Sequence, residues 1–72
     1  MTKEIKFEKV IKKFMKDNKL SQRKLADKAN CSQEIVNKWV NHGVFPSLLS
    51  LIELAAAFDV TLDYLVYGDE NV

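Results

Sequence analysis

Apolar residues near the start of the chain recur with the spacing of an α-helix. They stand at i, i+3, i+4, i+7 and i+8, which a helix places on one face, and they are Phe7, Val10, Ile11, Phe14 and Met15. Lysines occupy the opposite face at positions 6, 9, 12, 13 and 16. The pattern predicts an amphipathic helix that Thr2 caps and that ends near Asp17 or Asn18, after which Leu20 closes over the core.

Residues 21–40 predict two short helices joined by a tight turn. Ser21 and Ser32 each stand directly before a helical pattern, where a serine hydroxyl can accept a backbone N–H of the first turn. The first helix is expected over residues 22–29 and the second over about 33–40. Asn30 lies at the break, and asparagine is the best non-glycine residue for a left-handed turn.

The apolar residues of this segment give each short helix an inward face. In the first helix they fall at i, i+1 and i+4 and are Leu25, Ala26 and Ala29. In the second helix they are three apart and are Val36 and Trp39. Cys31, in the turn, is expected to point inward as a small apolar group. This is the form of a helix-turn-helix, whose second helix enters the major groove of DNA.

The C-terminal half predicts a loop over residues 41–46 and two further helices. Ser47 caps the fourth helix, whose buried stripe is expected to be Leu48, Leu51, Ile52, Ala55 and Phe58, with Leu54 alongside. Thr61 caps a short fifth helix that ends at Gly68, with Leu62 and Leu65 inward and Tyr64, Val66 and Tyr67 partly exposed. The sequence therefore predicts an all-α class, with one five-helix domain over residues 1–68 and a short acidic tail over 69–72.

The chain resembles the helix-turn-helix regulators of the phage lambda repressor and Cro (xenobiotic-response-element-like) type. The resemblance begins with Gln22, which opens the first helix of the motif, and includes Leu25, Ala26, Ala29, Ser32, Val36 and Trp39. It continues through residues 46–48, 54–55 and 59–65 and covers roughly residues 5–68. It implies a compact lambda-repressor-like fold with the helix-turn-helix at its second and third helices. Because this family often has glycine where Lys19 stands, Asn18 is expected to take the left-handed conformation instead.

The function that the resemblance implies is sequence-specific DNA binding by a transcription regulator, most simply a phage or bacterial repressor. A net charge of only +1 is low for such a protein. The charges are unevenly distributed, however, because all the lysines and the arginine lie between residues 3 and 38, whereas the acidic C-terminal quarter contains Asp59, Asp63, Asp69 and Glu70. A basic face can therefore meet phosphate while the chain stays nearly neutral. The lysines of the first helix are either a solvated surface or, for one or two of them, phosphate contacts.

The candidate base readers are the outward residues at the start of the motif's second helix, which are Ser32, Gln33, Glu34 and Asn37. Gln33 leads, because an amide pairs bidentately with adenine. Glu34 either accepts from cytosine N4 or only complements the positive N-terminus of its helix. The predicted phosphate contacts are Gln22, Arg23, Lys38 and Asn41, and the resemblance implies that Gln22 also braces Gln33.

The chain departs from the family pattern in one short region. Val40, Val44, Phe45 and Leu49 stand where the family usually has charged residues, and Gly43 comes one residue later than the family glycine. Either the loop folds these side chains inward, or they form an apolar patch for a partner, most simply a second copy. The prediction is a homodimer on a pseudopalindromic double-stranded operator with half-sites about 34 Å apart. Its interface candidates are Val44, Phe45, Tyr64 and Tyr67.

Catalysis and metal binding find little support in the sequence. Cys31 has no partner cysteine, and His42, the only histidine, lies in the loop without an organised nucleophile. We expect no enzyme, no catalytic residue, no metal, no cofactor and no small-molecule effector. The chain has no run of 18 apolar residues and no apolar signal core, so no membrane partner is expected. A lone cysteine fits the reducing cytoplasm.

A second function stays open on the same fold. The near-neutral charge and the apolar loop favour a protein-interaction module with weak DNA binding, such as an antitoxin, an anti-repressor or a coactivator. The short length favours a small Cro-like regulator over a repressor with a separate effector domain, but an excised DNA-binding domain of a longer protein is also compatible with it.

Overall fold

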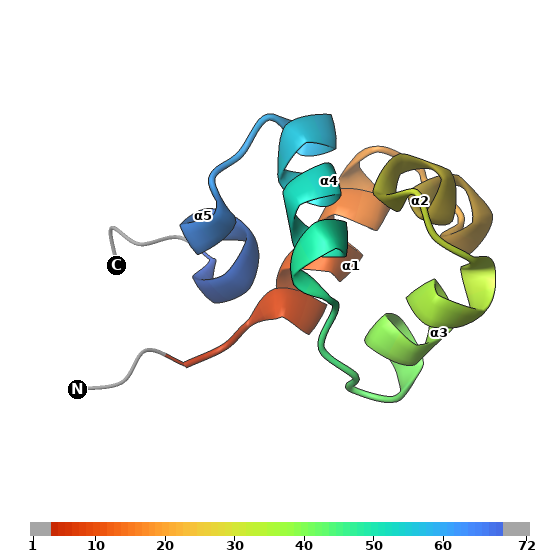
Figure 1. Cartoon of the computed structure of the whole chain (residues 1–72), viewed down its shortest axis with the longest axis horizontal. Coiled ribbons are helices and arrows are strands. Elements are labelled where there is room, and N and C mark those ends of the chain that lie inside the picture. The colour runs from red at the N-terminus through yellow and green to blue at the C-terminus, as the bar shows by residue number, and fades with distance from the viewer. Residues whose placement is uncertain (1–3, 69–72) are drawn as a thin grey trace.

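The computed structural model describes residues 4–68 and contains five α-helices (Figure 1). They are α1 (Phe7–Asp17), α2 (Gln22–Ala29), α3 (Gln33–Asn41), α4 (Leu48–Phe58) and α5 (Leu62–Tyr67). No strand occurs among these residues, so the predicted five-helix all-α class is confirmed. Within the same range no helix is long and apolar enough to cross a membrane. Thr2 and the predicted tail at 69–72 lie outside the described residues.

Four of the helices begin at the hydroxyl residue that the sequence predicts. In each case the side-chain oxygen accepts the backbone N–H three residues further on, at distances between 3.0 and 3.3 Å. The capping residues are Ser21, Ser32, Ser47 and Thr61. Because each cap satisfies a donor that the helix leaves free, the local sequence fixes these four starting points.

The first helix begins later than predicted. Its N-cap is Lys6, which makes no side-chain capping bond, so the predicted cap by Thr2 is wrong. The backbone N–H of Lys6 instead donates to the carbonyl of Val66 at 2.7 Å. This bond joins the segment before α1 to the end of α5. The helix α1 begins at the next residue, Phe7.

Three helices end at a non-glycine residue in the left-handed conformation. Lys19, Asn30 and Asp59 have φ of 53°, 56° and 55°, and the N–H of the residue after each donates to a carbonyl five positions back. The prediction for Asn30 is confirmed, but the prediction that Asn18 replaces Lys19 is wrong. The Asn18 side chain donates to the Phe14 carbonyl at 2.9 Å, which holds Asn18 at a φ of −103° and leaves the left-handed position to Lys19.

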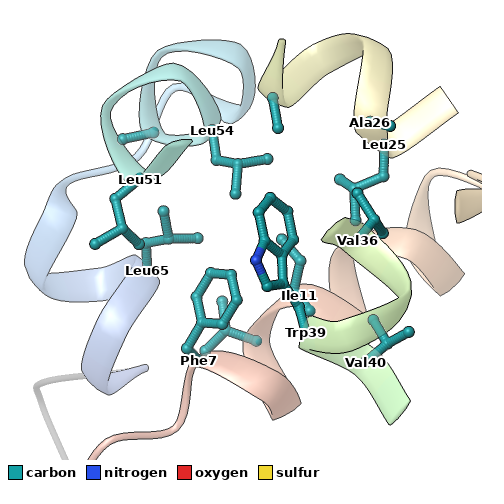
Figure 2. Close-up of a cluster of buried hydrophobic side chains, with 13 residues drawn as sticks. Phe7, Ile11, Leu25, Ala26, Val36, Trp39, Val40, Leu51, Leu54 and Leu65 are labelled. Carbon is teal, nitrogen blue, oxygen red and sulfur yellow. The ribbon is translucent and has the colours of Figure 1, made fainter. Parts of the chain in front are cut away.

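The core lies where all five helices meet, around the indole of Trp39 (Figure 2). Phe7 packs edge-on against this indole, with ring centroids 5.8 Å apart. The side chains that solvent does not reach are Trp39, Ile11, Leu25, Leu54, Leu65 and Val36. The predicted stripe of α1 is confirmed, because Phe14 and Met15 also pack against this core, as do Leu20 and Cys31.

The prediction of which α4 residues are buried is partly wrong. Leu48 and Ile52 were expected inside but are 65% and 48% exposed. The buried side is instead formed by Leu51, Leu54 and Ala55, with Phe58 partly buried. Since Glu53 is the only charged residue in α4, the apolar pattern alone could not say which face turns inward. On α5, Leu65 is buried as predicted, whereas Leu62 is 39% exposed at the first turn.

The packing of the helices leaves the helix-turn-helix at one end of the molecule. In Figure 1, α2 and α3 lie at the end opposite α5 and the described start of the chain. α2 packs against α3 and α4, and α1 packs against α3 and α5. The remaining helices therefore support α2 and α3 from behind and leave their outer surfaces uncovered.

Candidate nucleic-acid interface

The turn between α2 and α3 is defined by backbone hydrogen bonds. Asn30 adopts the left-handed conformation, and the N–H of Cys31 donates to the Ala26 carbonyl at 3.0 Å. Ser32 then caps α3 by accepting the N–H of Ile35 at 3.3 Å. These contacts fix the direction in which α3 leaves α2, so the first turn of α3 has a defined position relative to the start of α2.

The two helix starts enclose a shallow hollow of about 470 Å³. Its lining residues all carry polar side chains, and they are Gln22, Ser32, Gln33, Glu34 and Asn37. The structure therefore brings together the four residues predicted to read bases and Gln22, which was predicted to brace Gln33. Beneath this surface Val36 and Trp39 are 0% and 1% exposed, as predicted, so the inward residues set the rotation of α3 and leave Gln33 exposed.

The remaining predicted contact residues lie outside this hollow. Arg23 is exposed in the first turn of α2, and Lys38 is exposed near the end of α3. Asn41, at the end of α3, donates from Nδ2 to the Oδ1 of Asn37. This amide pair joins Asn37, which lines the hollow, to Asn41, which does not. The i,i+4 spacing of the two asparagines was the sequence signal for this contact.

The charges at the two helix starts differ. The first turn of α2 contains no acidic residue and carries Arg23 and Lys24, although the N-terminus of a helix is itself electropositive. The first turn of α3 carries Glu34, which complements the positive end of that helix. An anion near the start of α2 would therefore meet a positive surface, whereas Glu34 limits how closely one can approach the start of α3.

The predicted dimer-interface residues lie in two separate places. Val44 and Phe45, each 46% exposed, line a second hollow of about 170 Å³ together with residues that include Ile5 and Trp39. Tyr64 and Tyr67 on α5 are partly buried. Of the other departures from the family pattern, Val40 is buried in the core, and Leu49 is 65% exposed. Of the four departures only Val40, at the end of α3, is buried, whereas Val44 and Phe45 of the loop and Leu49 of α4 are exposed.

The described residues include no group of three or more His, Cys, Asp or Glu side chains that could hold a metal ion. Cys31 is partly buried, and this desolvation raises the pKa of its thiol above the ordinary value. His42 is exposed directly after α3, where its backbone N–H donates to the Lys38 carbonyl at 3.1 Å.

A family model described as helix-turn-helix matches residues 11–65, which is most of the chain. The chain belongs to this helix-turn-helix family, and both the family and the fold are those of DNA-binding transcription regulators. Over 65 residues it is 32% identical to YqaE of Bacillus subtilis (strain 168), an uncharacterized HTH-type transcriptional regulator. That match covers 90% of this chain and 56% of YqaE, so the chain spans little more than half the length of this relative.

Solved structures share the arrangement of the five helices. The P22 c2 repressor in complex with a synthetic operator superposes with a TM-score of 0.78 at 25% identity, covering 88% of this chain and 96% of that one. The solution structure of the P22 c2 DNA-binding domain gives a TM-score of 0.76 at 25% identity, with 96% and 90% covered. A transcriptional regulator from Listeria innocua gives 0.82 at 23% identity, with 96% and 64% covered, and this match concerns the fold alone.

Proposed function

We propose that this chain is a sequence-specific transcription regulator, a repressor of bacterial or phage origin that places α3 in the major groove of operator DNA. The observation that carries the proposal is the polar hollow in which Gln22 of α2 meets the first turn of α3. The names of the relatives support it, since YqaE is an HTH-type transcriptional regulator and the P22 c2 repressor was solved with a synthetic operator. Such a regulator acts in the cytoplasm and needs no cofactor.

Ser32, Gln33, Glu34 and Asn37 are the proposed base-reading residues. They line the hollow together, and a helix in the major groove reaches base edges with its first turns. The Gln33 side chain has an amide NH₂ group that can donate to adenine N7 and an amide oxygen that can accept from adenine N6. Such a bidentate pair favours adenine over the wrong base by about 1–3 kcal/mol. Asn37 differs, because its oxygen is held by Asn41. The NH₂ group of Asn37 can donate to a base acceptor such as guanine N7 or O6, and its oxygen keeps a second lone pair that can accept from a base amino group.

Gln22, Arg23 and Lys38 are the proposed phosphate contacts. A helix start leaves its first backbone N–H groups without intrahelical partners; at α2 the Ser21 hydroxyl takes that of Lys24, and the first turn contains no acidic residue. A backbone phosphate there would also be within reach of the Arg23 guanidinium. Asn41 was predicted as a fourth phosphate contact. Its NH₂ group donates one hydrogen to Asn37, which favours a role in positioning the Asn37 side chain, and its second amide hydrogen could still donate to phosphate.

Selection from random oligonucleotides tests the function directly. We expect a preferred site with two symmetric half-sites about one DNA turn apart, bound by two chains. Gln33→Ala should weaken binding to that site by about 1–3 kcal/mol and relax the preference at one base pair of each half-site, with the circular dichroism spectrum unchanged. Unchanged affinity and preference would refute the assignment of Gln33.

The salt dependence of binding separates base reading from phosphate contact. Arg23→Ala should lower the slope of log K against log salt by about 1, because one phosphate contact is lost. Lys13→Ala is the matched control, since it also removes one positive charge but lines a different hollow, with Tyr64 of α5 and Gly68. Equal effects of the two substitutions would mean that only net charge matters and that α2 does not face the DNA.

A protein-interaction module is the second candidate function, and the exposed apolar side chains of the loop and of α4 favour it. If this second function is correct, the affinity of the wild-type protein for DNA should hardly change with salt concentration, and selection should yield no preferred sequence.

A further inference from the structure

A hollow of about 170 Å³ between α1 and α5 combines lysines with apolar side chains. The two helices pack against each other, and the hollow's lining residues are Lys6, Lys9, Val10, Lys13, Phe14, Tyr64 and Gly68. We call it the lysine hollow. It shares no residue with the polar hollow at the starts of α2 and α3, so the proposed DNA-binding residues leave it unused.

The three lysines of this hollow occupy one side of α1. Lys9 and Lys13 follow Lys6 by three and seven residues, a spacing that a helix brings to one side. At a rise of about 1.5 Å per residue, Lys6 and Lys13 are about 10 Å apart along the helix. Lys12 belongs to a different contact, because its Nζ lies 2.9 Å from the Glu8 carboxylate. Three ammonium groups therefore share a short stretch of surface.

The positive charge of the lysine hollow is not neutralised within residues 4–68. Among these residues no carboxylate forms an ion pair with any of the three lysines. Glu4 and Glu8 line a neighbouring hollow with Lys6 and Lys9, but Glu8 is paired with Lys12. An excess of positive charge therefore remains, and such a surface favours a partner that carries negative charge.

The apolar residues of the lysine hollow leave space for one uncharged group. Val10 and Gly68 are buried, and Phe14 and Tyr64 are partly buried. A Cβ at Gly68 would lie 3.7 Å from Val10 Cγ2 and 3.8 Å from Lys6 Cδ, so the glycine leaves the space between these side chains open. A cavity of about 150 Å³ can hold benzene, whereas small-molecule sites usually measure about 300–1,000 Å³. The hollow therefore fits a single side chain better than a whole small molecule.

A protein segment suits this combination better than a nucleic acid does. Single-stranded nucleic acids bind by phosphate charge and by stacking bases on exposed aromatic rings. The Phe14 ring is already stacked on Phe58, with centroids 4.4 Å apart, and contacts the Tyr64 ring at 6.1 Å. An extended protein segment, in contrast, places carboxylates three residues apart at a separation of about 10 Å, with side chains between them. That separation equals the distance along α1 from Lys6 to Lys13.

We propose that the lysine hollow is a docking site for an acidic segment of another protein. The segment inserts one apolar side chain into the hollow, and its carboxylates pair with the three lysines. The ion pairs supply attraction to negative charge, and the hollow selects the side chain that lies between the charges. This inference goes beyond the proposed function and does not rest on it, because it uses no residue of α2 or α3.

Fluorescence anisotropy with a labelled synthetic peptide tests the lysine hollow without DNA. The first probe is a short peptide with glutamates on both sides of one central phenylalanine, and the second probe has serine in place of the phenylalanine. At about 50 mM salt, where exposed charges are only partly screened, the wild-type protein should bind the phenylalanine probe with a Kd below about 1 mM. The serine probe should bind at least about 10-fold more weakly, because it buries no large apolar side chain.

Substitutions on α1 identify the residues that bind the probe. Lys13→Gln should weaken binding of the phenylalanine probe by about 2- to 5-fold, and Lys9→Gln combined with Lys13→Gln by about 5- to 20-fold, as expected for the loss of exposed ion pairs. Lys12→Gln is the matched control, because it removes the same charge from the adjacent position but lies outside the hollow. It should change the affinity by less than about 1.5-fold. All three lysines are exposed, and circular dichroism checks that each variant is folded.

The two probes and the control also define the results that would overturn the proposal. A wild-type protein that binds neither probe, or both equally, has no site for an apolar side chain here. Equal weakening by Lys12→Gln and Lys13→Gln would mean that only net charge matters. Duplex or single-stranded DNA that binds more tightly than the probe, and loses that affinity in the double variant, would make a nucleic acid the occupant.

The acidic residues after Gly68 provide a further test of the occupant. Asp69 and Glu70 follow Gly68 in the sequence and lie outside the described residues. If the variant Asp69→Asn with Glu70→Gln binds the phenylalanine probe and the wild type does not, the occupant is this chain's own acidic segment, and the proposal of a separate partner is overturned. Selection of DNA sites by the double lysine variant is measured separately, so loss of peptide binding with an unchanged operator preference distinguishes this inference from the proposed function.

Discussion

Replacing Leu54 with alanine should remove much of the stability of this domain. Leu54 is completely buried between α4 and the core around Trp39 (Figure 2). Leu→Ala at such sites costs about 2.7–5 kcal/mol, because it leaves a cavity as well as losing apolar burial. A chain of 72 residues has a total unfolding free energy of roughly 4–11 kcal/mol. The melting temperature should therefore fall by at least about 10 °C.

Leu48→Ala is the matched control on the same helix. It is the same chemical change six residues earlier, at a side chain that is 65% exposed, and surface substitutions usually stay within about 0.5 kcal/mol. Thermal and urea unfolding followed by circular dichroism at two protein concentrations give both values. If Leu48→Ala cost as much as Leu54→Ala in dilute protein, the rotation of α4 described above would be wrong.

Three further predictions concern α3 and the turn before it. Ser32→Ala removes the N-cap and should cost about 1 kcal/mol in urea unfolding, with weaker operator binding, whereas Ser32→Asp should retain most of the stability; equal stability of Ser32→Ala and wild type would contradict the cap. Asn41→Leu removes the donor that contacts the oxygen of Asn37, so the base preference at the proposed Asn37 position should relax, and an unchanged preference would count against a positioning role for Asn41. Burial raises the pKa of Cys31, so the folded thiol stays protonated to higher pH than the unfolded one. Its alkylation rate should therefore rise at higher pH in folded than in urea-unfolded protein, and coincident profiles would refute this.

Local chemistry made much of this fold predictable from sequence. A serine or threonine hydroxyl can satisfy a helix donor only at the N-cap, so Ser21, Ser32, Ser47 and Thr61 marked four helix starts correctly. The outward residues of α3 were predictable as well, because the spacing of the buried Val36 and Trp39 fixes which side of the helix faces outward.

The remaining errors arose where the sequence offered equivalent choices. α4 has apolar residues on every side, so only its contacts with the other helices decide that Leu51 is buried and Leu48 is not. Lys19 takes the left-handed position because a side-chain bond holds Asn18, and that bond depends on the exact end of α1. Likewise the start of α1 is set by the contact of Lys6 with Val66, which is sixty positions away in the chain.

That same contact determines where additional polypeptide can be attached. The bond between Lys6 and Val66 brings the two ends of the described chain to the end of the molecule that is farthest from α2 and α3 (Figure 1). A fluorescent reporter or an affinity tag joined on either side would therefore project away from Gln33. Fusions at both ends should be tolerated without shielding the proposed DNA-binding surface, which makes energy-transfer labelling of a protein–DNA complex practicable.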